Sequence, residues 1–209
     1  MDSREYSLRD LAVYVAVFAA FYLIFQVAPS MWAELLTART SSAVMSLVGL
    51  ESGYGVTGDL VYLDLTSGVR PVHVYIVREC SAIHVLGVIL GLIVPLKHGS
   101  WARKSAAVAL GSALVFVMNV SRVVLTVVLT GYDVPPLSWW LTDPTVETYH
   151  YPISFVYGVV GIAVTIAVID RFVLPELGDF LASLPDTMSR LVRNRQNTDS
   201  MNRHRQDRV

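Results

Sequence analysis

Three side chains of this sequence carry the functional groups of a cysteine acyl-transfer site: Cys80, which is the only cysteine, Arg122 and His150. A cysteine attacks a carbonyl as a thiolate; a nearby cation lowers the thiol pKa, whereas apolar burial raises it. A histidine within hydrogen-bond reach can take the thiol proton and later protonate a leaving amine. These residue types predict Cys80 as the nucleophile and His150 as the general acid and base. Arg122 is suited to hold the thiolate, stabilise an oxyanion or bind a substrate carboxylate, and the sequence leaves these roles open.

The surrounding sequence is strongly apolar, which indicates an integral membrane protein. Of the 209 residues, 54% are hydrophobic and only 16% are charged, and the mean hydropathy is +0.52. Soluble domains have about 25% charged residues. A net charge of −1 with scattered basic residues gives no reason to expect a nucleic-acid partner. A single cysteine excludes an internal disulfide and multi-cysteine metal centres, and we expect neither a metal nor a cofactor.

Four apolar runs are long enough to cross a bilayer, which needs about 20 helical residues. We therefore expect an all-α integral membrane protein with four transmembrane helices, at residues 11–29, 80–96, 105–130 and 152–174. No cleavage site follows the first run, so we expect it to remain as an anchor helix.

The Lys and Arg residues next to the spans predict the orientation, because cytoplasmic loops are enriched in them. Residues 97–104 and the tail at 175–209 are basic, whereas 131–151 lacks Lys and Arg and contains Trp139 and Trp140, typical of a membrane boundary. Both termini, including residues 1–10, are thus expected in the cytoplasm of this multi-pass cell-membrane protein. The polar end of the tail is expected to be partly disordered.

The segment 30–79, expected to face outward, contains two candidate elements. The apolar run 41–50 is too short to span and is expected as an amphipathic or re-entrant segment at the interface. In residues 59–77, apolar and polar residues alternate on both sides of a Ser67-Gly68 turn, which is typical of a β-hairpin. We therefore expect a small outward-facing hairpin before the second span.

The candidate site residues lie on helix faces that can meet. Cys80 and His84 share one face of the second span, and Asn119 and Arg122 share one face of the third. Cys80 and His150 lie at the outer ends of their spans, and Arg122 lies about 12 Å below the outer end of its helix. All three are expected in the outer half of the membrane. We expect Asn119 and His84 to support the site, with His84 as a second candidate base.

The motifs around these residues resemble those of the exosortase/archaeosortase family of membrane cysteine transpeptidases, from about Leu47 to Leu174. The matching motifs are Val77-Arg78-Glu79-Cys80-Ser81-Ala82-Ile83, Asn119-Val120-Ser121-Arg122 and His150. Ala82 stands where many members have glycine, and the chain is shorter than members with more spans. The chain therefore looks like a minimal four-span core of that family.

The resemblance implies a function. It implies recognition of secreted surface proteins by a C-terminal sorting signal (a short motif, a hydrophobic helix and a basic end), cleavage near the motif, and transfer of the new C-terminus to an acceptor, expected to be a membrane lipid. It implies Cys80 as the nucleophile, Arg122 as the arginine of the N-x-x-R motif and His150 as the third catalytic position, where some members have arginine. We expect the face with Gly87 and Gly91, or the groove between the second and fourth spans, to receive the substrate helix.

The alternative interpretation is a non-enzymatic four-span scaffold or subunit in which Cys80 is structural or acylated. In a variant of it, Cys80 with His84, or His84 with His150, binds a metal or haem, although such small mixed sets are weak support for a ligand site. Replacing Cys80 by serine separates the two classes, because only a nucleophile is needed for processing.

Overall fold

The structure, a computed structural model, describes residues 7–135, 145–185, 187 and 189. Three helices are long and apolar enough to cross a membrane: α1 (Leu8–Val27), α4 (Trp101–Tyr132) and α6 (Val146–Phe172). The apolar helix α3 (Ile83–Ile93) has only 11 residues, or about 16 Å. The protein is mostly helical, as predicted, but the described part contains three helices of spanning length, not four.

The segment around α3 nevertheless runs alongside α1 from end to end. Arg78 donates to carbonyls at the C-terminal end of α1, and Lys97 Nζ lies 3.0 Å from the Asp10 carboxylate in the first turn of α1. The segment is not one helix, because η1 (Arg78–Cys80) is a 3-10 turn and Ala82 has a left-handed backbone with a φ of 58°. The continuous helix predicted for the second span is therefore broken near its outer end.

The glycine face of α3 packs against α1. A Cβ added at Gly87 would lie 2.8 Å from the Phe25 Cβ, and one added at Gly91 would lie 2.8 Å from a ring carbon of Phe18. Glycine permits this close approach between two helices. The expectation that this face receives a substrate helix is therefore wrong, because α1 already covers it.

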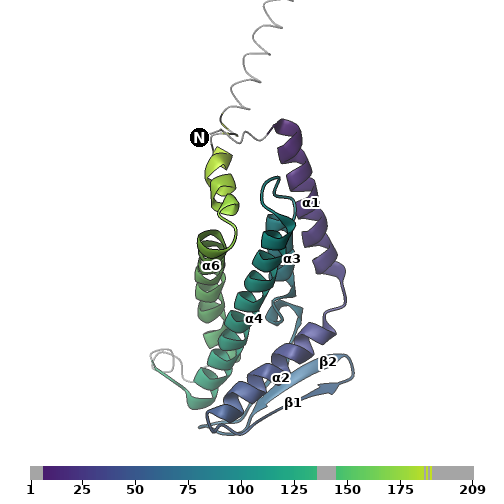
Figure 1. Ribbon diagram of the computed structural model, residues 1–209. Helices are drawn as coiled ribbons and strands as arrows, with labels where there is room; N and C mark the ends of the chain where they lie inside the picture. Colours follow the sequence, from purple (N-terminus) through teal and green to yellow (C-terminus); the bar gives the residue numbers. More distant parts are fainter. Residues whose placement is uncertain (1–6, 136–144, 186, 188, 190–209) are drawn as a thin grey trace, which may run out of the picture.

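A small α/β layer lies at one end of the helices (Figure 1). It consists of α2 (Met31–Leu47) and an antiparallel sheet of β1 (Ser52–Thr57), β2 (Leu60–Leu65) and β3 (Val72–Ile76), in that order. The predicted hairpin corresponds to β2 and β3, and β1 is a third strand that the sequence did not predict. The run 41–50, expected as a separate interfacial segment, contains the second half of α2.

One hydrophobic core joins this layer to α4. The apolar side chains of β2 on the inner face of the sheet are fully buried, Ala38 and Met45 of α2 pack against them, and two valines of α4 complete the core. The members include Val61, Leu63, Leu65, Ile76, Ala38, Met45, Val123 and Val127. The C-terminal part of α4 thus packs against the sheet as well as against the other helices.

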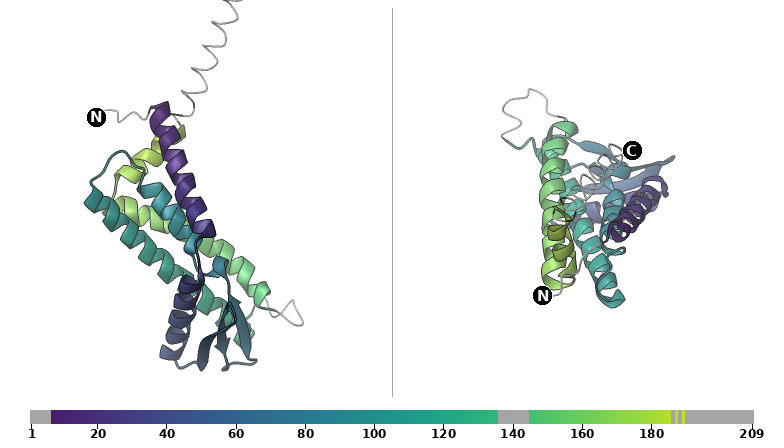
Figure 2. Two further views of the ribbon diagram at one scale, coloured as in Figure 1. Left: turned by 90° about the vertical axis from the view of Figure 1, so that its right-hand side faces the viewer. Right: turned by 90° about the horizontal axis from the view of Figure 1, so that it is seen from above.

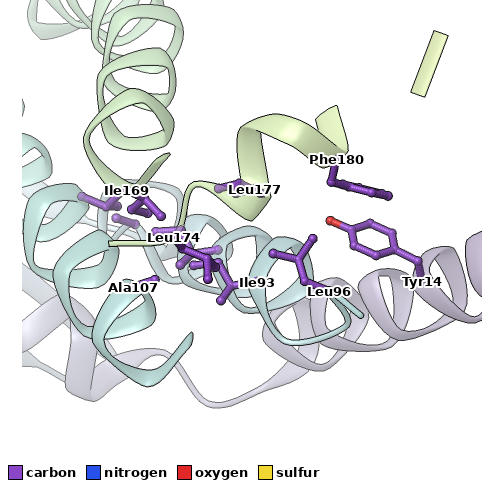
Figure 3. Packing of buried hydrophobic residues seen from close by; sticks show 11 residues of the cluster. Tyr14, Ile93, Leu96, Ala107, Ile169, Leu174, Leu177 and Phe180 are labelled. Atoms are coloured by element: carbon purple, nitrogen blue, oxygen red, sulfur yellow. The ribbon is translucent and has the colours of Figure 1, made fainter. Parts of the chain in front are cut away.

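The opposite end of the molecule contains the start of α1 and the helical residues 176–185 (Figures 1 and 2). There the Tyr14 ring lies beside the Phe180 ring, with centroids 4.3 Å apart, and Leu96 and Leu174 pack nearby (Figure 3). The segments expected outside the cell thus share one end, and those expected in the cytoplasm share the other. Trp139, Trp140 and the last part of the tail lie outside the described residues.

Candidate active site

Cys80 ends the η1 turn between β3 and α3. Its amide donates to the Val77 carbonyl at 2.8 Å, and its carbonyl accepts a 2.7 Å hydrogen bond from Asn119 Nδ2. The Ser81 hydroxyl donates to the Arg78 carbonyl at 2.7 Å. These bonds fix the backbone on both sides of the thiol, so the sheet and α4 together set the position of Cys80.

Arg78 joins this turn to the end of α1. Its guanidinium donates to the carbonyls of Phe25 at 3.2 Å, Gln26 at 2.9 Å and Ala28 at 2.7 Å. The last carbonyls of a helix lack partners and carry partial negative charge, so a cation there is favourable. Because α1 has 20 residues, it is about 30 Å long and matches a bilayer core. Cys80 therefore lies at the level where a helix of membrane length ends.

Asn119 and Arg122, three residues apart on α4, both contact the Cys80 turn. Asn119 is 7% exposed and donates to the Cys80 carbonyl, and Arg122 Nη2 lies 3.4 Å from the Glu79 carbonyl. The Nε of Arg122 is buried and has no hydrogen-bond partner among the described residues. The guanidinium thus has unused hydrogen-bonding capacity next to Cys80.

His150 lies near the start of α6. That helix begins at Val146, capped by Thr145, so His150 is inside it and not in a loop before it as expected. Its Nε2 lies 3.3 Å from the Ser154 hydroxyl one turn further on, and its ring meets the Tyr151 ring edge-on with centroids 5.7 Å apart. The helix therefore fixes the direction of the imidazole more firmly than a loop would.

Cys80, Arg122 and His150 line one cavity of about 60 Å³, which we call the Cys80 hollow. Its other walls come from β3, from α4 and from Val146 of α6; the lining residues on β3 are Val74, Tyr75 and Ile76. The structure thus brings together the three side chains that the sequence singled out, from three different elements. Their catalytic roles remain predictions.

Arg122 and His150 lie at similar distances from the ends of α4 and α6 that are remote from the sheet (Figure 1). Arg122 lies 21 residues after Trp101, and His150 lies 22 residues before Phe172. Both separations correspond to about 32 Å, close to the thickness of a bilayer core. Arg122 was expected well below the outer end of its span, but α4 continues ten residues beyond it, beside the sheet. A bilayer core that begins at Trp101 would end near Arg122, and at that boundary a cation costs less than at mid-membrane.

The electrostatic environment of Cys80, which lies outside the three spanning helices, disfavours the free thiolate. Burial raises the pKa of the Cys80 thiol above its ordinary value, and the Arg122 guanidinium opposes this without cancelling it. The thiol is therefore protonated at neutral pH. Attack by Cys80 requires a base in the hollow, and the imidazole of His150 has the right chemistry.

His84 does not line the Cys80 hollow, although it was expected to support the site. Its Nδ1 is buried without a hydrogen-bond partner among the described residues. Within the part of the chain that the structure describes, no group of three His, Cys, Asp or Glu side chains is placed to hold a metal ion.

A second cavity, of about 90 Å³, lies between α3, α4 and α6 and shares Arg122 with the Cys80 hollow. It is mostly apolar, and small residues of α6 form one side; its lining includes Ala82, Val115, Asn119, Tyr157, Gly158 and Gly161. We call it the α4–α6 groove. It corresponds to the groove expected from the sequence between the second and fourth spans, and Arg122 lies in its wall.

The sequence alone predicts no role for Arg78, although the motif around Cys80 contains it. The available signal was a basic residue at the end of an alternating strand, directly before an apolar run. Such a residue is equally typical of an exposed strand end. Its hydrogen bonds to α1 cannot be predicted without knowing that the η1 turn lies next to the C-terminal end of α1.

Comparison with known proteins gives one match. A family model described as transmembrane exosortase matches residues 6–169, which include Cys80, Arg122 and His150. No curated protein and no solved structure matches the chain.

Proposed function

Because the chain belongs to the transmembrane exosortase family, we propose that it is a membrane cysteine transpeptidase that processes secreted surface proteins. It cleaves their C-terminal sorting signal and transfers the new C-terminus to a membrane lipid. Cys80 is the nucleophile, His150 the general acid and base, and Arg122 the cation that stabilises charge at the reacting carbonyl. The observation that carries the proposal is the convergence of these side chains in one hollow at the level where α1 ends.

In the first half of the reaction, the Cys80 thiol gives its proton to His150 while sulfur attacks the carbonyl carbon of the scissile peptide bond. The carbonyl oxygen becomes an oxyanion, which the Arg122 guanidinium can neutralise. The C–N bond then breaks, the leaving amine takes the proton from His150, and the substrate stays attached to Cys80 as a thioester.

In the second half, a hydroxyl or amino group of the lipid gives its proton to His150 and attacks the thioester carbonyl. The C–S bond breaks, and sulfur recovers the proton as the thiol. The peptide bond is thereby exchanged for an ester or amide bond to the lipid, with no change in oxidation state. Water in place of the lipid gives hydrolysis.

The position of the site favours a membrane-anchored substrate. A substrate held by its own apolar helix brings its scissile bond to the membrane boundary, and confinement of both partners to the bilayer raises their effective concentration. The α4–α6 groove, with Gly158 and Gly161 on one side, offers space for that helix next to Arg122. The proposal includes cytoplasmic termini and a site on the extracytoplasmic side.

The test is co-expression with a secreted reporter that ends in the short motif, apolar helix and basic tail of a host surface protein. Cleavage and lipid attachment are read by mass spectrometry for the wild type, Cys80→Ala, Arg122→Ala and His150→Ala. Ser121→Ala is a matched control, because among the described residues the Ser121 hydroxyl bonds only the Met118 carbonyl of its own helix, at 2.8 Å.

We expect processing by the wild type and Ser121→Ala, and its loss in the other three variants at equal protein levels. A hydroxylamine-sensitive peptide adduct on Cys80 would identify the thioester. Equal processing by Cys80→Ala would refute the proposal and favour the scaffold interpretation.

A further inference from the structure

The strand that leads into the Cys80 turn lies at an edge of the sheet. The strand order is β1-β2-β3, so β2 pairs with one side of β3 only. Among the described residues, no backbone hydrogen bond joins the other side of Val72–Ile76 to any segment. An edge strand with free amides and carbonyls is a template for another extended chain.

The direction of each backbone group on β3 follows from the register. The Thr66 amide donates to the Glu51 carbonyl at 2.9 Å, so even-numbered residues of β2 face β1 and odd-numbered residues face β3. The odd-numbered residues pair with Val72, Val74 and Ile76. The amides and carbonyls of His73 and Tyr75 therefore point to the free side.

Two cavities adjoin β3 on the side of α6. One is the Cys80 hollow, lined by Tyr75, and the other is a wider opening of about 330 Å³ lined by residues that include Val72, His73 and Glu147. Val146 of α6 lines both, so the two cavities are neighbours between β3 and the start of α6. Space for an extended chain thus leads along the edge of β3 towards Cys80.

We propose that the substrate segment on the outward side of its apolar helix binds as a fourth strand along the free edge of β3. The occupant is an extended polypeptide, because the edge offers one amide and one carbonyl at His73 and again at Tyr75, two residues apart. This spacing matches the period of a β-strand and no helical period. The inference rests on the proposed function and adds how the substrate is held.

This mode of binding positions the scissile bond. Strand addition fixes the register of a peptide through main-chain bonds, while side-chain pockets supply sequence preference. Because only Val77, Arg78 and Glu79 separate β3 from Cys80, a chain held at Tyr75 delivers one of its next carbonyls to the Cys80 hollow. The sheet then sets the cleavage position, and His150 and Arg122 act on the carbonyl placed there.

Proline variants at the two edges of the sheet test the inference, with the reporter defined above as the probe. Tyr75→Pro removes the outward amide of β3, and Tyr75→Val removes only the ring. Val56→Pro is the matched control, because Val56 pairs with an odd-numbered residue and its amide points away from β2 at the opposite edge. A proline at such an edge position leaves the remaining ladder intact.

We expect Tyr75→Pro to lower kcat/KM for the reporter at least about threefold below that of Tyr75→Val, as loss of one backbone hydrogen bond predicts. Tyr75→Val is the reference for loss of the ring, and Val56→Pro should stay close to the wild type. Prolines placed one at a time in the outward segment of the reporter should lower processing at alternate positions. This scan uses the wild-type enzyme, so it decides the question even if Tyr75→Pro does not fold.

Two results would overturn the inference: equal kcat/KM for folded Tyr75→Pro and Val56→Pro, or a proline scan without a two-residue period. Both leave the proposed function intact, because the wild type still processes the reporter through Cys80. Failure of the wild type to process it, or processing by Cys80→Ala, instead refutes the proposed function.

Discussion

The hydrogen bond from Asn119 to the Cys80 carbonyl is a direct test of how the nucleophile is positioned. Asn119→Leu nearly conserves the side-chain volume but removes the donor that lies 2.7 Å from the Cys80 oxygen. Asn119 is 7% exposed, so water replaces that donor poorly. A buried acceptor left without a partner costs about 1–3 kcal/mol.

That cost sets the expected effects of Asn119→Leu. In a chain of this size it lowers the unfolding midpoint by about 2–4 °C per kcal/mol. If the turn moves to find another donor, the thiol moves with it, and the full cost reaches the transition state. The value of kcat/KM for the reporter then falls about 5- to 150-fold.

The assay compares Asn119→Leu with Ser121→Ala in detergent, by thermal unfolding and by reporter processing. The Ser121 bond lies within α4 and does not touch the Cys80 turn, so Ser121→Ala should change kcat/KM less than twofold, or about 0.4 kcal/mol. Wild-type processing by Asn119→Leu would contradict the view that α4 positions Cys80 through this bond. Equal losses in both variants would point to a general effect on α4.

Three further predictions concern the same turn. Arg78→Leu should lower the free energy of unfolding by about 2–3 kcal/mol, because the charge-assisted hydrogen bonds to α1 are lost, and Arg78→Lys should lower it by less. Unfolding midpoints measure both effects, and a wild-type midpoint for Arg78→Leu would contradict the prediction. Ala82 has a left-handed φ, so Ala82→Val should lower the free energy of unfolding by about 1–2 kcal/mol more than Ala163→Val on the exposed side of α6. Ala82→Gly should have an unfolding midpoint no lower than that of the wild type. The reverse order of midpoints would argue against a strained backbone at Ala82. Burial raises the pKa of the Cys80 thiol, and Arg122 lowers it. The rate of alkylation of Cys80 by iodoacetamide should therefore keep rising at pH values where an ordinary thiol is already ionised, and Arg122→Gln should lower that rate at each pH. Equal alkylation rates in the two proteins would refute the electrostatic contact.

The sequence predicted the elements whose hydrophobic pattern is strong. The three long helices and the hairpin of β2 and β3 follow from apolar runs and from alternation. β1 escaped prediction because Gly53 and Gly55 have low strand propensity. In the structure, the Tyr62 ring lies where a side chain at Gly55 would be, so a larger residue at this position would displace that ring.

α2 was missed over its first half for a different reason. Its buried face carries small polar residues, including Thr37, Ser41 and Ser42, so the apolar period of an amphipathic helix is absent. Helix prediction from hydrophobic period fails when a helix packs against a sheet through hydroxyl-bearing side chains. The break before α3 was also not predictable, because an alanine such as Ala82 does not indicate a positive φ.

For the candidate site, residue types predicted the members, and helix faces predicted their convergence. The separation of His84 from the Cys80 hollow was not predictable, because Cys80 and His84 share a face only if the helix is continuous from Cys80 onward. The 3-10 turn and the left-handed residue rotate the rest of the helix relative to Cys80. The apolar run of α4 also did not reveal that its C-terminal part packs in the core beneath the sheet, through Val123 and Val127.

The Arg78 contact makes the site sensitive to the bilayer itself. Because Arg78 bonds the carbonyls at the end of α1, the Cys80 turn is held next to the C-terminal end of that helix, which is about 30 Å long for its 20 residues. Lipids with longer acyl chains would submerge the thiol below the headgroups, and shorter chains would raise it into water. We therefore expect the rate of processing in reconstituted vesicles to pass through a maximum as acyl-chain length varies, which makes hydrophobic thickness a determinant of where in a cell this protein works.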